Sequence, residues 1–311
     1  MAKIDSKEVI RVKGMGFLFN RETGDKFNAR VVSENGCITA KQMSCLAVAA
    51  EKFGSGDAAF TSRMCIEIQG VSFENIEPLQ KHLAEAGLAT GGTGDKIRPV
   101  VACKGKTCVF GLVASTDIAK DIHKRFYEGY RGVELPHKFK IAVGGCPNNC
   151  VKPDLNDVGL VGQKKPIINL EKCKGCGKCL VESGCLMKAA KKGENGLINI
   201  DTNRCNNCGK CISACPFKCI EVKDEGVKVL IGGRWGREGR KGSYLQGIYP
   251  VEEALNIIEK IILVYRDNSF KKERFADMID RIGFEKVESL IFESNVIERK
   301  EEIITKEILK R

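Results

Sequence analysis

Two cysteine runs near the middle of the chain limit most strongly how this sequence can fold. The first has the spacing C-x2-C-x2-C-x5-C and consists of Cys173, Cys176, Cys179 and Cys185. The second has the spacing C-x2-C-x2-C-x3-C, is followed by Pro216, and consists of Cys205, Cys208, Cys211 and Cys215. Runs of this kind are typical of short loops that wrap four-iron clusters. The sequence therefore predicts a small unit built around two such clusters.

The second run is the one found in bacterial two-cluster ferredoxins, in which the fourth cysteine of each run ligates the other cluster. We therefore expect one cube to be held by Cys173, Cys176, Cys179 and Cys215. We expect the other cube to be held by Cys205, Cys208, Cys211 and Cys185. The first run is longer than the second, and Leu186 stands where the second has Pro216. The segment also repeats internally, since residues 185–189 match residues 215–219.

Four further cysteines follow two predicted strands. Cys103 and Cys108 come after the apolar run 99–102, and Cys146 and Cys150 lie in the loop Gly-Cys-Pro-Asn-Asn-Cys that follows a strand predicted over 135–143. Four thiolates that converge from two strand ends suit a third cube, because the loop backbone can wrap a cluster and donate hydrogen bonds to it. A structural zinc site and buried free cysteines are the alternatives for these four residues.

Cysteine use also indicates the cellular compartment. Twelve of the sixteen cysteines fall into the three groups above. The four others, which we expect to be buried as small apolar side chains, are Cys37, Cys45, Cys65 and Cys219. The sequence has no stretch of signal-peptide type and no apolar run long enough to span a bilayer. We therefore expect a cytoplasmic protein without a membrane partner, in a reducing compartment.

The formal net charge of +11 raises the question of nucleic-acid binding. Ten of the eleven excess positive charges lie between residues 95 and 224, the part that carries the twelve motif cysteines. A four-iron cube with four thiolates has a formal charge of about −2 when oxidised, so three cubes would offset more than half of this excess. We interpret the basic residues as compensation for bound cofactors and expect no nucleic-acid partner.

Hydrophobic periodicity and turn residues predict the remaining elements. A helix is expected over 38–53, with Thr39 as its N-cap, and others over 75–86 and 110–127. A strand is expected over 59–68, in which alternation turns Arg63 away from the apolar face. In the strand over 135–143, Lys138 and Lys140 must share one face. The last third of the chain is predicted to be helical over 251–265, 275–282, 287–297 and the charged stretch 298–311.

A basic loop follows a strand predicted over 227–233. Three glycines are interspersed with four positive residues, namely Arg234, Arg237, Arg240 and Lys241. Such a loop suits an anionic ligand that the backbone approaches closely, and a solvated loop is the alternative.

Taken together, these motifs resemble the sirohaem-dependent sulfite and nitrite reductases, most closely the single-repeat type found among anaerobic sulfite reductases. The matching stretches cover about residues 30–285: 101–108, 145–150 with 157–162, the inserted cysteine runs, and the loop at Gly232 with Glu273-Arg-Phe275. The chain departs from the family pattern in two places. Four residues separate Cys103 from Cys108 where five are usual, and Met64 replaces a glutamine.

The resemblance implies an α+β fold with a ferredoxin-like N-terminal subdomain (1–95), a sirohaem and cluster core in two parts (96–165 and 225–311), and an inserted two-cluster ferredoxin domain (166–224). It implies that Cys103, Cys108, Cys146 and Cys150 hold a cube, with the Cys150 thiolate bridging to sirohaem. Arg63, Lys138 and Lys140 match the family's anion pocket, and Arg98 fits a further arginine of that pocket. Because sirohaem is a polycarboxylate, Arg234, Arg237, Arg240 and Lys241 are our candidates for binding it.

The resemblance also implies a function. We expect a six-electron reduction of sulfite to sulfide, with nitrite to ammonia as the alternative. A non-catalytic iron–sulfur electron-transfer subunit, or a metal-stapled nucleic-acid binder, would belong to other classes. The sequence has no dinucleotide-binding Gly-x-Gly-x-x-Gly after a strand, so electrons should come from another protein, a ferredoxin or a reductase subunit. Because the chain has one repeat where fused relatives have two, we expect a homodimer or a higher homo-oligomer.

Overall fold

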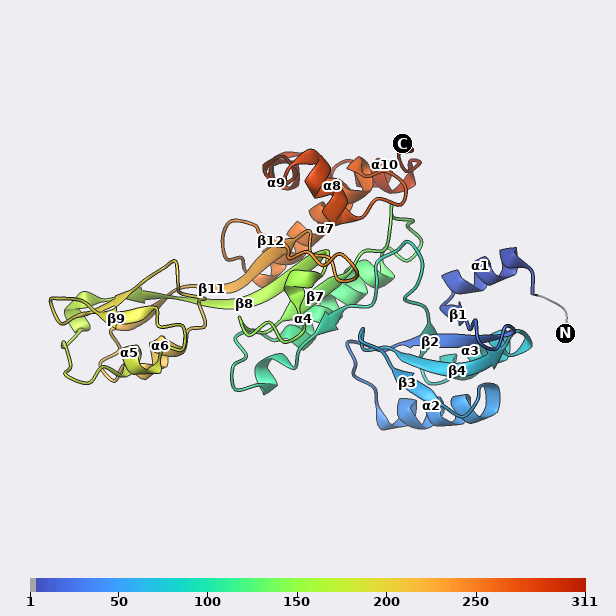
Figure 1. Ribbon diagram of the computed structural model, residues 1–311, viewed down its shortest axis with the longest axis horizontal. Coiled ribbons are helices and arrows are strands. Elements are labelled where there is room, and N and C mark those ends of the chain that lie inside the picture. Colours follow the sequence, from blue (N-terminus) through green and yellow to red (C-terminus); the bar gives the residue numbers. More distant parts are fainter. Residues whose placement is uncertain (1–3) are drawn as a thin grey trace. The chain divides into compact units, whose positions relative to one another are not determined.

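The computed structural model describes residues 4–311 (Figure 1). The chain divides into two compact units, each assembled from separate stretches of sequence. Unit 1 contains residues 1–101, 119–141 and 259–311, and unit 2 contains residues 102–118 and 142–258. The segment 166–224 that carries both cysteine runs lies wholly within unit 2. Over the described residues, no helix combines the length and the apolar character that a bilayer crossing requires.

The N-terminal part of unit 1 is an antiparallel sheet with helices packed against it. The strands β1 (Phe17–Phe19), β2 (Lys26–Val32), β4 (Ile66–Ser72) and β3 (Ala58–Phe60) pair in that order, and β5 (Ala89–Thr90) pairs with β2. The helices are α1 (Ser6–Gly14), α2 (Ala40–Phe53) and α3 (Ile76–Ala84). Side chains on β2 alternate between buried and half-buried, as expected for a sheet with one covered face.

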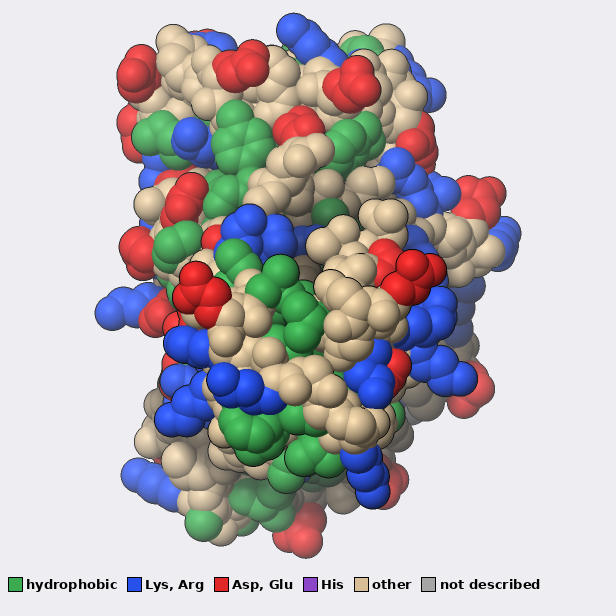
Figure 2. Space-filling model, turned by 90° about the vertical axis from the view of Figure 1, so that its left-hand side faces the viewer, with side chains coloured by type: hydrophobic (Ala, Val, Ile, Leu, Met, Phe, Trp, Pro, Cys, Tyr) green, Lys and Arg blue, Asp and Glu red, His purple; other side chains and the backbone are tan. Residues whose placement is uncertain are grey.

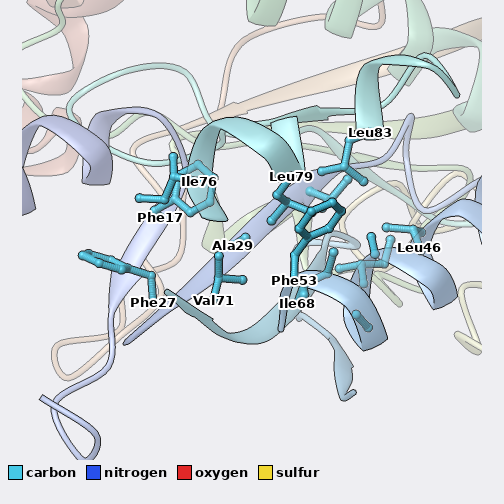
Figure 3. Close-up of a cluster of buried hydrophobic side chains, with 14 of the residues drawn as sticks. Phe17, Phe27, Ala29, Leu46, Phe53, Ile68, Val71, Ile76, Leu79 and Leu83 are labelled. Atoms are coloured by element: carbon cyan, nitrogen blue, oxygen red, sulfur yellow. The ribbon is translucent and has the colours of Figure 1, made fainter. Parts of the chain in front are cut away.

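A continuous apolar core holds these elements together (Figure 3). Phe17, Phe27 and Ile68 from the sheet and Leu79 and Leu83 from α3 are all fully buried. Burying one such side chain contributes about 1.5–3 kcal/mol, so the core dominates the stability of this sheet.

Local signals predicted the ends of α2 well. Thr39 accepts a hydrogen bond from the Gln42 N–H, and the Gln42 side chain accepts one from the Thr39 N–H, which completes a capping box. Gly54 follows the last residue of the helix, as predicted.

The strand predicted over 59–68 is interrupted. β3 ends at Phe60 and β4 begins at Ile66, and the two strands form an antiparallel hairpin in which Ala58 pairs with Ile68. The Thr61 N–H donates to the Cys65 carbonyl, and Met64 takes a left-handed φ of 58°. Arg63 therefore lies on a turn and not on a strand, so the prediction from alternation was wrong at this residue.

The second half of unit 1 is mainly helical. Its elements include the π-helix His123–Glu128, most of α7 (Val251–Asn268), α8 (Phe275–Ile282), α9 (Phe284–Glu293) and α10 (Lys300–Thr305). The predicted bounds of α8 are confirmed. The helix predicted over 110–127 begins later, as α4 (Ser115–Ile122), because the Leu112 and Val113 N–H groups donate to the Gly145 carbonyl instead of joining a helix.

Unit 2 is organised by a second sheet, in the order β12, β11, β8, β7, β6. The long strands β8 (Val158–Ile168) and β11 (Ile220–Ile231) run antiparallel along their whole length, and β12 (Ser243–Tyr244) pairs with the end of β11. The short strands β6 (Val101–Ala102) and β7 (Ile141–Gly144) lead into the Cys103 and Cys146 loops. The two strand ends are neighbours, as the sequence predicted.

The segment between β8 and β11 contains two matching halves. The helices α5 (Leu180–Gly184) and α6 (Lys210–Ala214) each lie at the third cysteine of a run, and β9 (Ala190–Lys192) pairs with β10 (Ile198–Ile200). After each run, Lys188 and Lys218 take left-handed φ values of 51° and 53°, and their N–H groups donate to the carbonyls of Cys185 and Cys215. The internal repeat read from the sequence is therefore present in the backbone.

Candidate functional site

The loops after β6 and β7 bring four cysteines of unit 2 together. The Cys103 N–H donates to the Val143 carbonyl at 3.1 Å, which ties the two strand ends to one another. The Cys103 Sγ accepts a hydrogen bond from the Gly145 N–H at 3.0 Å. Each loop then carries its second cysteine, Cys108 or Cys150, a few residues further on.

Cys103 is prepared to act as a thiolate. Burial acts to raise the pKa of its thiol, but hydrogen bonds from the Ser115 hydroxyl and from the Gly105 and Gly145 N–H groups keep the pKa below its ordinary value. The Ser115 Oγ lies 3.4 Å from the Cys103 Sγ, and its single proton is shared with the Cys103 carbonyl, to which the hydroxyl donates at 2.7 Å. Backbone donors that point at a ligand sulfur are typical of iron–sulfur sites.

The other three cysteines surround the same place. Burial raises the pKa of the Cys146 thiol, and the charges of Cys103, Cys150 and Cys108 raise it further. Four thiolates this close need a cation or a cluster to offset their mutual repulsion. The residues therefore fit a cluster.

A close approach of two backbone segments shapes this site. A Cβ on Gly162 in β8 would lie 2.4 Å from the Gly145 carbonyl oxygen, so only glycine allows β8 to approach the loop this closely. Asn149 takes a left-handed φ of 57°, and its amide donates to Asp154 at 2.7 Å. The Asn149 side chain thus ties the loop to the segment that follows Cys150.

The cysteines of the second run form their own pocket together with Cys185. This pocket in unit 2 is lined by Cys185, Cys205, Cys208 and Cys211, along with apolar residues such as Ile200. Burial, together with the charges of the nearby Cys205, Cys208 and Cys185, raises the pKa of Cys211 to about 11. The fourth cysteine of the first run is therefore brought to the first three of the second, which is the crossed arrangement expected from the sequence.

The fourth cysteine of the second run likewise lies near the start of the first run. Cys215 is a charged neighbour of Cys173. Cys219, one of the four cysteines outside the motifs, is buried with its Sγ 3.2 Å from the Cys215 Sγ, and burial raises its pKa to about 12. Cys65 is buried and Cys45 half-buried, whereas Cys37 is exposed, so the expectation of burial was wrong for Cys37.

Over residues 4–311, no three His, Cys, Asp or Glu side chains converge as they would around one metal ion. A cube holds its thiolates farther apart than a single ion does. The fit to clusters rests on the shared pocket and on the mutual electrostatic influence of the cysteines described above.

The basic loop of unit 2 is a closed hairpin. Arg234 and Arg240 exchange backbone hydrogen bonds at 2.8 and 2.9 Å. The Arg234 side chain pairs with Glu238 at 3.2 Å, and the Arg240 guanidinium donates to the Gly232 carbonyl at 2.7 Å. The Gly242 N–H donates to the Asp154 carbonyl, so the hairpin is fixed against the segment that follows Cys150.

Two of the four predicted sirohaem-binding residues therefore have defined protein contacts. The side chains of Arg237 and Lys241 belong to the same hairpin. The hairpin presents positive charge next to the cysteine loop, which suits a polycarboxylate.

In unit 1, Arg63 is held by backbone carbonyls. Its guanidinium donates to the Pro99 carbonyl, at 3.1 Å through Nε, and to the Ile141 carbonyl at 3.1 Å. These two carbonyls belong to the segments that lead toward Cys103 and Cys146. Arg63 therefore both joins the two segments and places a positive charge beside them.

Arg98, Lys138 and Lys140 lie along the same pair of segments. Ile97 and Phe139 form a parallel bridge, the Phe139 N–H donates to the Lys96 carbonyl, and the Arg98 N–H donates to the Phe139 carbonyl. Phe139 is fully buried and stacks on Tyr265 at 5.4 Å. Because side chains alternate along extended backbone, the residues that flank Ile97 and Phe139 share the opposite face. The structure thus brings the four predicted anion-binding residues onto adjoining segments of unit 1.

The Arg98 guanidinium has an unused donor. Its Nε is buried and has no hydrogen-bond partner among the described residues, while one terminal nitrogen donates to the Gly92 carbonyl. Burial, together with the charge of Arg30, lowers the pKa of Arg98 to about 10. A buried donor without a partner is costly, so this position fits an anionic group.

Sequence reasoning did not identify two neighbouring arginines. Arg30 pairs with Glu67 at 2.6 Å and donates to the Gly92 carbonyl, which Arg98 also uses. Arg274, at the start of α8, is close enough to lower the pKa of Arg98 and of His137. The stretch Glu273-Arg-Phe275 marked the second of these only as part of a motif, and nothing local marks Arg30.

Comparison with known protein families shows which family this chain belongs to. A model described as "Nitrite and sulphite reductase 4Fe-4S domain" matches residues 93–299, and one described as "Nitrite/Sulfite reductase ferredoxin-like half domain" matches residues 19–86. The chain belongs to the nitrite and sulphite reductase family. This family assignment confirms the resemblance read from the motifs, and it supports binding of an iron–sulfur cluster and of sirohaem.

Two relatives from one organism match most of this chain. The coenzyme F420-dependent sulfite reductase of Methanocaldococcus jannaschii is 39% identical over 73% of this chain and 36% of its own length. An uncharacterized protein of the same organism is 34% identical over 86% of this chain and 92% of its own length. The chain thus spans about a third of the first relative and nearly all of the second.

A solved structure shows the same fold. The crystal structure of dissimilatory sulfite reductase I has a TM-score of 0.68 and 20% identity, and it covers 85% of this chain and 68% of its own chain. The half-repeat fold of the nitrite and sulphite reductase family, predicted from the motifs, is thereby confirmed.

Proposed function

We propose that this chain is a sirohaem- and iron–sulfur-dependent reductase that carries out the six-electron reduction of sulfite to sulfide. The observation that carries the proposal is the convergence of Cys103, Cys108, Cys146 and Cys150 at two neighbouring strand ends in unit 2. The name of the F420-dependent relative favours sulfite. Nitrite reduction to ammonia is the second candidate, because the family description names both anions.

The four cysteines would hold one cube through their thiolates, and Cys150, which is exposed, would bridge it to sirohaem. The cysteine runs would hold two further cubes in an inserted ferredoxin domain. Arg234, Arg237, Arg240 and Lys241 would pair with the sirohaem carboxylates. When bound, these cofactors supply single electrons at potentials that the protein tunes.

The basic residues of unit 1 would serve the anion. Arg63, Arg98, Lys138 and Lys140 offset its charge and fix its orientation, and fixed donors act most strongly where charge develops during the reaction. The lysine ammonium groups can also donate protons to the oxygens that leave as water. We further propose that the enzyme is a homodimer, since one repeat supplies only half of a twofold core.

Turnover by the anaerobically purified holoprotein tests this proposal. With reduced methyl viologen as donor, sulfite should give sulfide at a higher kcat/KM than nitrite gives ammonia. A higher kcat/KM for nitrite would make nitrite reduction the favoured function and sulfite reduction the second candidate. No turnover of either anion by a protein that contains sirohaem would contradict the reductase proposal and favour an electron-transfer role.

A further inference from the structure

One pocket of unit 2 joins two of the three cysteine groups. It is lined by Cys146 and Pro147 from the loop after β7, and by Asn206 and Cys208 from the second run. Phe110 also lines it. The group of Cys185, Cys205, Cys208 and Cys211 is therefore a neighbour of the cysteine group that contains Cys146.

The first run occupies a different place. We name residues 173–179 the outer loop and residues 205–211 the inner loop, which are matched parts of the internal repeat. None of the described residues that line the pocket shared with Cys146 belongs to the outer loop. Since the inner loop faces the core cysteines, the outer loop is the side from which an external donor can approach.

The surface around the outer loop is basic. Lys174, Lys178 and Lys218 are exposed, and none of the three forms an ion pair with any residue in 4–311. Lys218 follows Cys215, which completes the same cysteine group. We name these three lysines, together with Leu180 and Phe217, the outer face.

Apolar side chains lie among these charges. Leu180 and Phe217 are 50% and 47% exposed. Figure 2 views the molecule from the side on which α5 and α6 lie in Figure 1, and it shows blue Lys and Arg side chains around green hydrophobic ones. An apolar centre with a charged rim is typical of a protein-binding surface.

Nearby carboxylates do not cancel this charge. Glu221 pairs with Lys172 at 2.7 Å, and Glu182 accepts a hydrogen bond from the Lys192 N–H at 3.1 Å. The Lys192 ammonium donates to the Cys176 and Gly177 carbonyls of the outer loop, which adds one more positive charge there. Two further exposed carboxylates, Glu171 and Glu194, lie near the first run, and they are fewer than the four lysines Lys174, Lys178, Lys192 and Lys218.

We propose that the electron donor of this enzyme is an acidic redox protein that docks on the outer face. Cys173, Cys176, Cys179 and Cys215 would hold the cluster that accepts one electron from the donor at each encounter, which leaves the donor oxidised by one electron. The inference rests on the proposed reductase function and deepens it, because it names the chemistry of the partner and the place where it binds. Complementary charge of this kind raises the association rate and makes it depend on salt.

The internal repeat supplies a matched control for the experiment. Lys178 and Lys210 stand at equivalent positions, each one residue before the third cysteine of its run. Reversing either charge changes the electrostatic potential at its own cube to a similar extent. Only Lys178 belongs to the proposed docking surface.

The probe is a purified acidic two-cluster ferredoxin, reduced and mixed with the holoprotein in a stopped-flow instrument. Lys174→Glu and Lys178→Glu should each lower the second-order rate constant of cluster reduction about tenfold or more at low salt, relative to the rate with methyl viologen. Lys210→Glu should change it less than about twofold. At about 1 M salt the differences should disappear, because the Debye length falls to about 3 Å.

Equal losses in Lys178→Glu and Lys210→Glu would overturn the proposal, and so would unchanged rates in both outer-loop variants. Failure of the reductase proposal gives a separate result. In that case the wild-type protein would reduce neither anion with viologen. Reduced ferredoxin would still bleach the cluster absorption, so the rate constants of the three lysine variants could still be compared.

Discussion

The Arg63 guanidinium donates two hydrogen bonds to the carbonyl oxygen of Pro99. This contact gives a residue of the proposed anion pocket a structural role as well, because the same side chain reaches the Ile141 carbonyl. Arg63 therefore has two roles, since it supplies a positive charge for the proposed anion pocket and also connects two backbone segments.

Replacing Arg63 tests that coupling. Arg63→Lys keeps the charge but cannot reproduce the planar fork that reaches two carbonyls, so we expect a lower melting temperature as well as lower turnover. The loss of these hydrogen bonds should cost about 1–3 kcal/mol of unfolding free energy. Thermal unfolding and kcat of the variant are the measurements. Normal stability with reduced turnover would show that the contacts with the carbonyls are incidental.

Lys138 and Lys140 should behave differently from Arg63. Lys138→Met and Lys140→Met should leave the iron and sirohaem content intact and lower turnover about 10²-fold or more, since each removes a fixed charge and not a metal ligand. Lys120→Met, on the exposed surface of α4, is the control and should retain full turnover. Unchanged kinetics in both pocket variants would place the substrate elsewhere.

Glu273 provides a test of stability and its pH dependence. Its carboxylate is buried and accepts hydrogen bonds from Arg281 at 2.8 Å and from the Phe270 N–H at 2.9 Å. Burial acts to raise its pKa, but these bonds hold the pKa below the ordinary 4.5. Its contribution to stability should therefore be present above about pH 4.5 and be lost as the pH falls through the folded-state pKa.

Glu273→Gln should lower the unfolding free energy by about 1–3 kcal/mol at pH 7, because a charge-assisted pair is lost. The difference from wild type should stay constant from pH 7 to about 4.5 and shrink as the pH falls further through the folded-state pKa, as followed by circular dichroism. Glu285→Gln, at an exposed position of α9, is the control. A difference that also stays constant as the pH falls well below 4.5 would contradict a folded-state pKa that differs from the unfolded one.

Cys219 should tune the cluster next to it. Its thiol lies within hydrogen-bonding distance of the Cys215 sulfur, and a hydrogen bond to a ligand sulfur stabilises the more negative, reduced cluster. Cys219→Ala should therefore keep the cluster and lower its reduction potential, as measured by a redox titration that is followed by electron paramagnetic resonance. An unchanged reduction potential would mean that the Cys219 thiol fills space in the core and does not affect the cluster.

The sequence predicted the parts of the site that local patterns encode. The cysteine spacings identified all four residues at the β6 and β7 ends, and the two-cluster ferredoxin pattern predicted that Cys185 would join the second run. The capping residue Thr39 located the start of α2 to within a residue.

Residues whose conformation depends on distant contacts were harder to predict. The turn at Met64 needs a left-handed φ, which methionine rarely adopts, so the sequence gives no sign of a turn there. The alternation of side chains therefore predicted a strand that runs on through Arg63. The loop before α4 is fixed by hydrogen bonds from the Leu112 and Val113 N–H groups to the Gly145 carbonyl, which lies far away in sequence. Arg30 joins the basic cluster through Gly92, and no local signal records that contact.

The central claim is that one chain combines sirohaem with clusters held by twelve cysteines. The most direct test is the absorption spectrum and metal content of the protein purified without oxygen. The account predicts sirohaem bands together with cluster absorption, and about thirteen irons per chain. Cluster absorption without sirohaem, or zinc as the main metal, would contradict it.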